Sequence, residues 1–322
     1  MHKDKRERAS GRGCNPGVTH HADEIGASLS SAAKACLRTP AGVTLFCPSE
    51  DGSSGSGKMS PVSGPDDIRL SFNEAAETYD EVRPSYPVPL FEELFRLLPA
   101  QPQIVEVGPG TGKATRDLLA HGASVHAVEI GPAMAAKLRS NLPSPMLRIS
   151  VADFEQLPIE PRADAVFSAT AYHWISRGAQ TDRPAAILRL GGIVAIVDLI
   201  QVDSPEDSGF FDAAQPIYER YGQGHRGPPA PGRAMVDPPI RAVLQADRRF
   251  DATAVRSYDW NKTYSAADYR NLMLSYSATQ MMEESERRRL LDEIETFIRM
   301  EYAGSVTRPL VATLTTAVLA RQ

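Results

Sequence analysis

Five apolar runs alternate with helix-like segments between residues 103 and 200, and this alternation limits the folds open to the chain. The runs are QIVEV, SVHAVEI, MLRISVAD, ADAVFSAT and GIVAIVDLI, which begin at residues 103, 124, 146, 163 and 192. The segments between them predict helices over 113–122, 132–142 and 183–190. Continuous apolar strands that alternate with helices indicate a parallel sheet covered on both faces. We therefore predict an α/β fold with a doubly wound, Rossmann-like sheet.

The segments on either side of this alternation complete the predicted domain. Apolar residues at three- and four-residue spacing predict two helices before the first strand, over 68–82 and 87–99. Helical patterns around a Gly/Pro-rich loop predict a helical insertion after the fifth strand, over 205–248. Helices are expected over 265–277 and 284–304, and closing strands elsewhere in 249–322. The second of these helices has one apolar face, made of Leu290, Leu291, Ile294 and Ile298. Together these segments predict one domain over 66–322, with its core at 103–200.

Residues 1–65 show no sustained periodicity and are rich in Gly, Ser, Lys and Arg, so we expect a disordered extension. Residues 52–58, GSSGSGK, have the spacing of a phosphate-binding loop. However, Met59 stands where a Ser or Thr should hold magnesium, and SPVSGP follows where a helix should begin. A nucleoside triphosphate site is therefore not expected there.

Charge and cysteine content exclude several classes of function. Residues 1–58 hold eight Lys/Arg and six Asp/Glu, so the rest of the chain carries a net charge of −7. An acidic domain disfavours nucleic acid as a partner. All three cysteines precede Met59, so no thiolate metal site or disulfide framework is expected after it.

The distribution of apolar residues bears on location. No apolar run reaches 18 residues, and the first thirty residues hold no signal-peptide core. We therefore expect no membrane partner and a cytoplasmic location. The oligomeric state is left open.

A glycine-rich turn joins the first strand to the following helix. Gly108, Gly110 and Gly112 give the spacing G-x-G-x-G. The dinucleotide fingerprint is G-x-G-x-x-G, and the triphosphate loop needs four residues between its glycines. Neither phosphate pattern fits this turn.

Carboxylates at three strand ends favour a different ligand. Glu106 beside the turn would repel a pyrophosphate but suits a cationic group such as an α-amino group. Glu129 ends the second strand, where a carboxylate grips ribose hydroxyls in doubly wound folds. Asp153, with Phe154 beside it, suits the amino group and ring of adenine. An ammonium group, a ribose and an adenine together describe S-adenosylmethionine.

The stretch from Phe72 to Asp198 resembles the class I S-adenosylmethionine-dependent methyltransferases. The segments VEVGPGTG, HAVEIGPAM, VADFEQLP, DAVFSATAYHW and ILRLGGIVAI stand in the order and spacing of that family. FNEAAETYDEVRPSYP and YSAADYRNLMLSYS are further similar to the trans-aconitate methyltransferase-like, type 11, small-molecule enzymes. The resemblance implies a seven-stranded sheet and S-adenosylmethionine as cofactor. Leu190 departs from the family, which usually has Pro there.

The resemblance also implies roles for individual residues. Gly108, Pro109 and Gly110 would approach the cofactor closely. Glu106 would lie near its amino end, and Glu129 would bind the ribose. Ile130 would pack on the adenine, Asp153 would accept a hydrogen bond from its amino group, and the backbone N–H of Phe154 would meet the adenine ring. Ser168 and Thr170 would line the methionine and methyl region.

His173, just past the fourth strand, is the candidate catalytic base. Methyl transfer from a sulfonium depends largely on alignment, but an acceptor hydroxyl must also lose its proton. The unperturbed pKa of histidine suits that task. The alternative is a histidine that only shapes the pocket or forms a hydrogen bond to the backbone.

Four aromatic or basic residues are candidates for binding the acceptor. Tyr172 and Trp174 could stack on it, although one of them is expected in the core. Tyr79 and Arg83 precede the sheet, and Arg83 could pair with a carboxylate of cofactor or substrate. We expect a small organic acceptor, methylated at a hydroxyl or carboxylate oxygen. Two other readings stay open: a cofactor-binding protein without catalysis, and a methyltransferase acting on a macromolecule.

Overall fold

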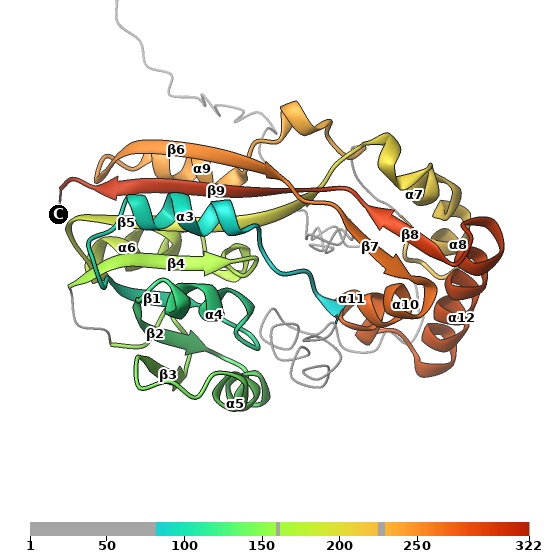
Figure 1. The fold of residues 1–322 in the computed structure, drawn as a ribbon, viewed down its shortest axis with the longest axis horizontal. Coiled ribbons are helices and arrows are strands. Elements are labelled where there is room, and N and C mark those ends of the chain that lie inside the picture. The colour runs from blue at the N-terminus through green and yellow to red at the C-terminus, as the bar shows by residue number, and fades with distance from the viewer. Residues whose placement is uncertain (1–81, 159–161, 225–228, 322) are drawn as a thin grey trace, which may run out of the picture. The chain divides into compact units, whose positions relative to one another are not determined.

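The computed structural model describes residues 82–158, 162–224 and 229–321 (Figure 1). The predictions for residues 1–65, for Tyr79 and for nearly all of the helix over 68–82 lie outside these residues.

A seven-stranded sheet forms the centre of the described chain, in the order β3-β2-β1-β4-β5-β9-β6. Its strands are β1 (Gln103–Val107), β2 (Ser124–Glu129), β3 (Leu147–Val151), β4 (Ala163–Ala169), β5 (Leu188–Gln201), β6 (Phe250–Asp259) and β9 (Leu310–Leu319). β1 to β5 pair in parallel, whereas β9 runs antiparallel between β5 and β6. The sheet confirms the predicted α/β, Rossmann-like fold class with seven strands, most of them parallel.

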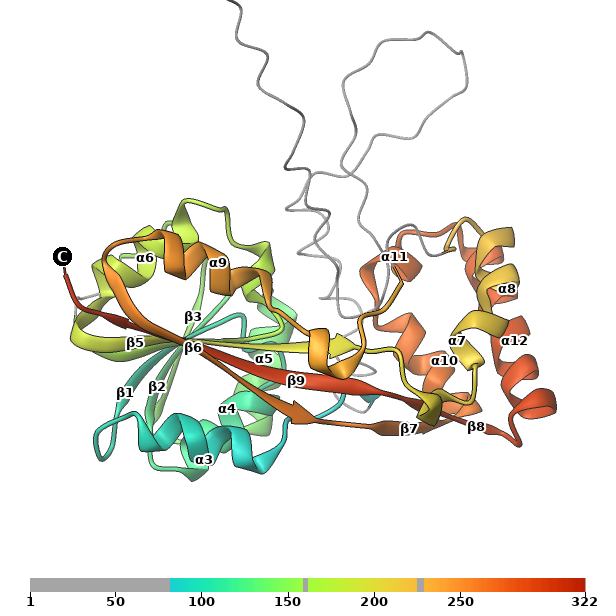
Figure 2. The ribbon, with the colours of Figure 1, turned by 90° about the horizontal axis from the view of Figure 1, so that it is seen from above.

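Helices cover both faces of this sheet, as Figure 2 shows for α3 and α4 on one side and α6 and α9 on the other. The bounds are α3 (Val88–Arg96), α4 (Lys113–Ala120), α5 (Pro132–Asn141), α6 (Ala179–Ile187) and α9 (Pro239–Ala246). One apolar core joins α3, α4 and α5 to the sheet through Leu94, Leu118 and Leu138. A second apolar core joins α6 and α9 to the sheet. Two-sided cover explains why β1, β4 and β5 are buried along most of their length.

A second group of elements has its own aromatic core. It consists of the helices α7 (Phe210–Ala213), α8 (Gln215–Arg220), α10 (Ala266–Leu274), α11 (Ser277–Gln280) and α12 (Glu284–Glu301), with a two-stranded sheet of β7 (Lys262–Ser265) and β8 (Ser305–Arg308). The predicted apolar face of α12 is buried here, and Phe210 packs edge-on against Tyr269 and Tyr302. Figures 1 and 2 both place the β7–β8 pair beyond the ends of β6 and β9.

The structure corrects three predicted helices. The helix predicted over 183–190 begins earlier and ends at Ile187, because Leu188 is buried in extended backbone and pairs with Ala163. The second helical stretch of the insertion divides into a 3₁₀ turn, Arg233–Met235, and α9, because Pro238 and Pro239 cannot continue a helix from the turn before them. The third, over 265–277, ends at Leu274.

Candidate functional site

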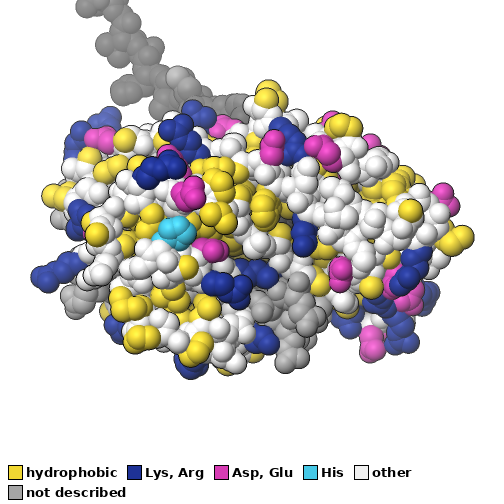
Figure 3. Space-filling model, viewed as in Figure 1, with side chains coloured by type: hydrophobic (Ala, Val, Ile, Leu, Met, Phe, Trp, Pro, Cys, Tyr) yellow, Lys and Arg dark blue, Asp and Glu magenta, His cyan; other side chains and the backbone are white. Residues whose placement is uncertain are grey.

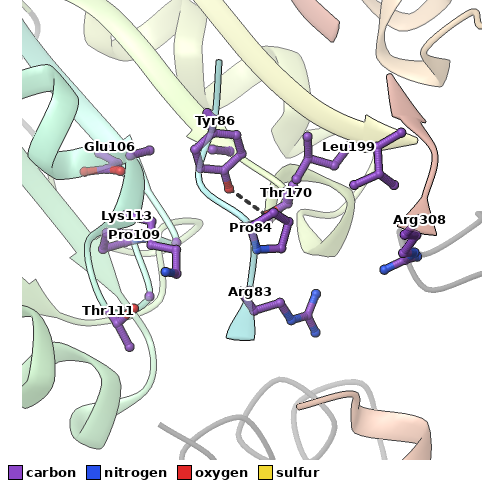
Figure 4. A pocket seen from close by; sticks show the side chains of 16 residues that line it. Arg83, Pro84, Tyr86, Glu106, Pro109, Thr111, Lys113, Thr170, Leu199 and Arg308 are labelled. Carbon is purple, nitrogen blue, oxygen red and sulfur yellow. Dashed lines mark hydrogen bonds between the residues drawn. The ribbon is translucent and has the colours of Figure 1, made fainter. Parts of the chain in front are cut away.

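A pocket lies at the carboxyl ends of β1, β4 and β5, where the glycine turn, the residues after β4 and the segment 83–86 meet (Figure 4). Ligands bind at this edge in open α/β sheets. Of the predicted site residues, the pocket lining includes Arg83, Glu106, Gly108, Pro109, Gly110 and Thr170. It also includes Tyr86, Lys113, Leu199 and Arg308, which were not among the candidates.

The glycine turn has a backbone that other residues adopt with difficulty. Gly108, Gly110 and Gly112 have φ angles of 64°, 57° and 97°, in the left-handed region. A Cβ atom added to Gly108 would lie 2.5 Å from the Cβ of Ala171. The turn therefore brings bare backbone to the pocket surface, and Gly108 also lets the segment after β4 pack against it.

Glu106 places a buried carboxyl group in the pocket wall. Only 1% of the residue is exposed, and Oε2 accepts a 2.7 Å hydrogen bond from the hydroxyl of Thr115. Burial, and to a smaller extent the nearby charge of Glu129, raises the pKa of Glu106 to about 8, against the lowering effect of the hydrogen bond. A carboxyl group in this state gains most from a cationic ligand, because a positive charge would restore its ionised form.

Glu129 stabilises the glycine turn through hydrogen bonds to its backbone. Its two carboxylate oxygens accept hydrogen bonds from the backbone N–H groups of Gly110, at 3.0 Å, and Gly131, at 2.8 Å. The carboxylate thus holds the turn in shape, in addition to the ribose contact that was predicted for it. Ile130 follows β2 and is half-buried.

Asp153 and Phe154 follow β3. The Asp153 carboxylate accepts hydrogen bonds from Glu155 N at 2.9 Å and from the Gln156 amide at 3.3 Å. The ring of Phe154 is 3% exposed, lies within the second core and carries the Arg183 guanidinium 5.4 Å from its centroid. The side chain is therefore core, and only the backbone of Phe154 is left for the predicted adenine contact.

Ser168, near the end of β4, and Thr170, directly after β4, have different orientations. Ser168 is fully buried and donates a 2.8 Å hydrogen bond to the carbonyl of Val107, so its side chain joins β4 to β1. Thr170 lines the pocket with a left-handed φ of 57°, and its hydroxyl lies 3.1 Å from that of Tyr86, as Figure 4 shows. Of these two candidates, the structure brings only Thr170 to the pocket.

The 3₁₀ turn Tyr172–Trp174 follows, and the predicted base His173 lies in it. Tyr172 is 2% exposed and donates a 2.8 Å hydrogen bond to the carbonyl of Gln180, so it is the member of the pair that lies in the core. His173 is half-buried with its ring 5.0 Å from Trp174, and neither residue is among the described residues that line the pocket. Burial, and then the charge of Arg83, lowers the pKa of His173 to about 4.

Two arginines reach the pocket from distant parts of the chain. Arg83 donates hydrogen bonds to the hydroxyl and carbonyl of Ser275, at 2.9 and 3.0 Å, and lies 4.6 Å above the ring of Tyr276. Arg308 ends β8, is 4% exposed, and donates to Gln201 and to the Tyr276 hydroxyl. The sequence does not predict Arg308 as a site residue, because the pairing of β7 with β8 that places it there has no clear pattern in the sequence.

On the face shown in Figure 3, basic, acidic and apolar side chains are mixed. Among the described residues, no helix is both long and apolar enough to cross a membrane, and no three His, Cys, Asp or Glu side chains are grouped to hold a metal ion.

The family model and the curated relatives that match this chain are named as methyltransferases. Residues 105–196 match the family described as a methyltransferase domain. An uncharacterized methyltransferase of Mycobacterium tuberculosis is 37% identical over 133 residues, which are 41% of this chain and 53% of that protein. Malonyl-[acyl-carrier protein] O-methyltransferase of Halorhodospira halophila is 35% identical over 135 residues, which are 40% of this chain and 44% of that protein. The chain thus spans about half the length of the curated relatives it matches.

Among solved structures, a phosphoethanolamine N-methyltransferase 2 of Haemonchus contortus is similar with a TM-score of 0.48 and 15% identity. The similarity covers 81% of this chain and 61% of that one.

Proposed function

We propose that this chain, which carries a class I S-adenosylmethionine-dependent methyltransferase domain, methylates a small organic acceptor at an oxygen atom. The family and the cofactor predicted from the sequence are confirmed, whereas the trans-aconitate subgroup is not. The acceptor, its methylated atom, the roles of individual residues, the domain boundaries and a cytoplasmic location all stay predictions.

The observation that carries the proposal is the buried carboxyl group of Glu106 beside a turn of left-handed glycines. S-adenosylmethionine, when bound, supplies a methyl group already activated on a sulfonium. Its amino-acid end carries an ammonium group, which suits a carboxyl whose pKa burial has raised to about 8. Gly108 and Gly110 admit a ligand close to the backbone. The residues present therefore fit this cofactor.

The chain's own contribution to catalysis is alignment and exclusion of water. Tyr86 and Thr170, whose hydroxyls lie 3.1 Å apart, form part of the pocket wall between the glycine turn and Arg308. Holding two reactants in line can supply much of a rate acceleration. A wall of this kind keeps the acceptor in one orientation.

The state of His173 bears on which oxygen is methylated. With its pKa lowered to about 4, His173 is neutral at pH 7 but is a weak base, and it lies outside the pocket lining. A carboxylate acceptor needs no base, whereas a hydroxyl does. This favours a carboxylate oxygen. The name of the Halorhodospira relative, an O-methyltransferase, supports oxygen as the methylated atom.

Calorimetric titration tests the proposal. S-adenosylmethionine and S-adenosylhomocysteine should bind with Kd values of about 1–100 μM, which corresponds to roughly 5–8 kcal/mol. NAD and ATP serve as ligand controls, and Gly110→Arg should abolish binding by filling the turn. Preference for NAD or ATP, or no binding of either sulfur compound, would overturn the proposal. Binding without any methyl transfer to a broad acceptor panel would instead favour a cofactor-binding protein.

A further inference from the structure

The pocket has two chemically different ends. In Figure 4, Glu106 and Lys113 lie on one side and Arg308 lies on the opposite side, with Tyr86 and Thr170 between them. The side chains of Arg83 and Arg308 extend toward one another from segments 225 positions apart in the chain. The end of the pocket that holds Arg308 therefore presents guanidinium groups.

We propose that Arg308, with Arg83 beside it, binds an oxyanion of the methyl acceptor, so that the substrate is an acidic molecule carrying a carboxylate or a phosphate. This inference rests on the proposed function. It goes beyond that function by naming the charged group that selects the acceptor and the residue that recognises it.

The chemistry of this end excludes most other ligand groups. A guanidinium has five N–H donors and no acceptor, so it can only meet acceptor atoms. Its planar fork matches the two oxygens of a carboxylate or phosphate. An amine or ammonium group on the acceptor would meet only like charge. The shared feature of the fitting ligands is therefore an oxyanion.

Burial increases the strength of this recognition. Arg308 is 4% exposed, and a charge pair in such surroundings interacts more strongly than it would in water. The side chain is also held in place, because Gln201 accepts from Nε at 3.0 Å and the Tyr276 hydroxyl accepts from another nitrogen. A guanidinium held from two sides loses little freedom when it binds a ligand.

A buried hydroxyl beside the arginines adds an independent observation. The hydroxyl of Tyr264 has no hydrogen-bond partner among the described residues, although the residue is only 2% exposed. Tyr264 lies on β7 opposite Val306, two residues before Arg308 on β8. Burial raises the pKa of this phenol, and the charges of Arg308 and Arg83 both lower it. Buried hydroxyls are usually paired. An oxyanion at Arg308 would offer this hydroxyl an acceptor.

The cofactor's own carboxylate is a different anion. In an α-amino acid the carboxylate and the ammonium group share one carbon atom. A cofactor whose ammonium meets Glu106 therefore carries its carboxylate to the Glu106 and Lys113 side. Arg308, on the other side of the pocket, is left for the acceptor.

The test uses full-length protein saturated with S-adenosylhomocysteine and measures the rise in Tm and the Kd for added small molecules. The probes are acetate, benzoate, glutarate and inorganic phosphate, with acetamide, benzamide and glutaramide as neutral counterparts. We expect at least one anion to bind and the amides not to bind. Whether a carboxylate or phosphate binds more tightly identifies the source of the oxyanion. Failure of every anion, or equal binding of amide and carboxylate, overturns the inference.

Variants then assign the binding to the residue. Arg308→Gln should weaken the best anion at least tenfold, as expected for loss of a charged hydrogen-bond donor, while the Kd for S-adenosylhomocysteine changes less than twofold. Arg308→Lys keeps the charge and should retain part of the binding. Arg189→Gln is the matched control, because Arg189 pairs with Asp164 in an exposed position away from the pocket lining.

Two outcomes separate this inference from the proposed function. If Arg308→Gln, still folded by circular dichroism, loses S-adenosylhomocysteine together with the anion, Arg308 serves the cofactor and the inference is wrong. If the unaltered protein binds no S-adenosylhomocysteine at all, the proposed function fails first. Because the comparison of anions and amides needs no variant, the inference stays open to refutation even if Arg308→Gln does not fold.

Discussion

The hydroxyl of Thr115, in the first turn of α4, donates a 2.7 Å hydrogen bond to Oε2 of Glu106 at the end of β1. The bond stabilises the ionised carboxylate and lowers its pKa, yet burial dominates and leaves the pKa at about 8. At pH 7, Glu106 is therefore mostly protonated before any ligand binds. This couples the cofactor site to pH.

We predict that binding of S-adenosylhomocysteine releases a proton and tightens as the pH rises from 6 to 8. The ligand's ammonium group favours the ionised carboxylate, so each pH unit below 8 weakens binding by up to about tenfold. Above pH 8 the affinity levels off. Calorimetry at pH 6, 7 and 8, in buffers with different heats of ionisation, measures both the affinity and the proton. Proton uptake would contradict the prediction.

Two variants serve as controls for this linkage. Glu106→Gln should bind more weakly at every pH and show a much flatter pH dependence. Thr115→Val keeps the shape of the side chain but removes the donor, so the pKa of Glu106 should rise. The steep part of the affinity curve should then move to higher pH.

Gly108→Ala should abolish cofactor binding and cost more stability than the same change at Gly122. Both residues have a left-handed φ, of 64° and 85°, and an alanine in that region costs about 1–2 kcal/mol. At Gly108 the added Cβ also meets Ala171 at 2.5 Å, whereas no described atom lies within 4 Å of that position at Gly122. Thermal unfolding and titration with S-adenosylhomocysteine measure the two effects. Equal losses of stability would show that the close approach to Ala171 is unimportant.

His173→Asn should lower kcat less than tenfold. Loss of a general base typically costs about 10²–10⁴-fold, but His173 has a pKa of about 4 and lies outside the described pocket lining. The same lowered pKa makes the folded protein lose stability as the pH falls from 6.5 toward 4, because only the unfolded chain takes up the proton readily. The variant should be less sensitive to acid. A drop in kcat of several hundredfold would restore His173 as the catalytic base.

Asp198→Asn should stabilise the protein at pH 7. Burial raises the pKa of Asp198, on β5, to about 6. Its ionisation therefore costs the folded state stability as the pH rises from about 4 to 6, and the loss persists above that range. Removing the charge should recover on the order of 1–3 kcal/mol, seen as a higher Tm. At pH 4 the folded-state carboxyl is already neutral, so the Tm values of the two proteins should differ by about a degree or less. A difference in Tm at pH 4 as large as the difference at pH 7 would contradict this account.

The central sheet could be predicted because its information is local. β1, β2, β4 and β5 are apolar runs of strand length bounded by turn residues, and β9 is a similar run. Glu106 and the glycines could be placed because the end of a parallel strand and the turn after it meet at one edge of the sheet.

The arginine end of the pocket could not be predicted because it depends on long-range pairing. Arg308 reaches the pocket only because β8 pairs with β7, more than 40 residues earlier in the chain. Short polar strands of this kind have no clear period in the sequence. The same limit applies to Tyr172, since a 3₁₀ turn after β4 decided which aromatic side chain entered the core.

β9 has a consequence for how the protein is made. It inserts between β5 and β6, both of which are synthesised earlier, and it is separated from Arg308 by Pro309 alone. While a ribosome is still adding residues 300–319, β5 has an unpaired edge, β6 has no partner strand in the sheet, and the pocket lacks Arg308. Such exposed edges invite aggregation in nascent chains. Acceptor recognition and protection from misassembly should therefore be completed in the same late step of synthesis.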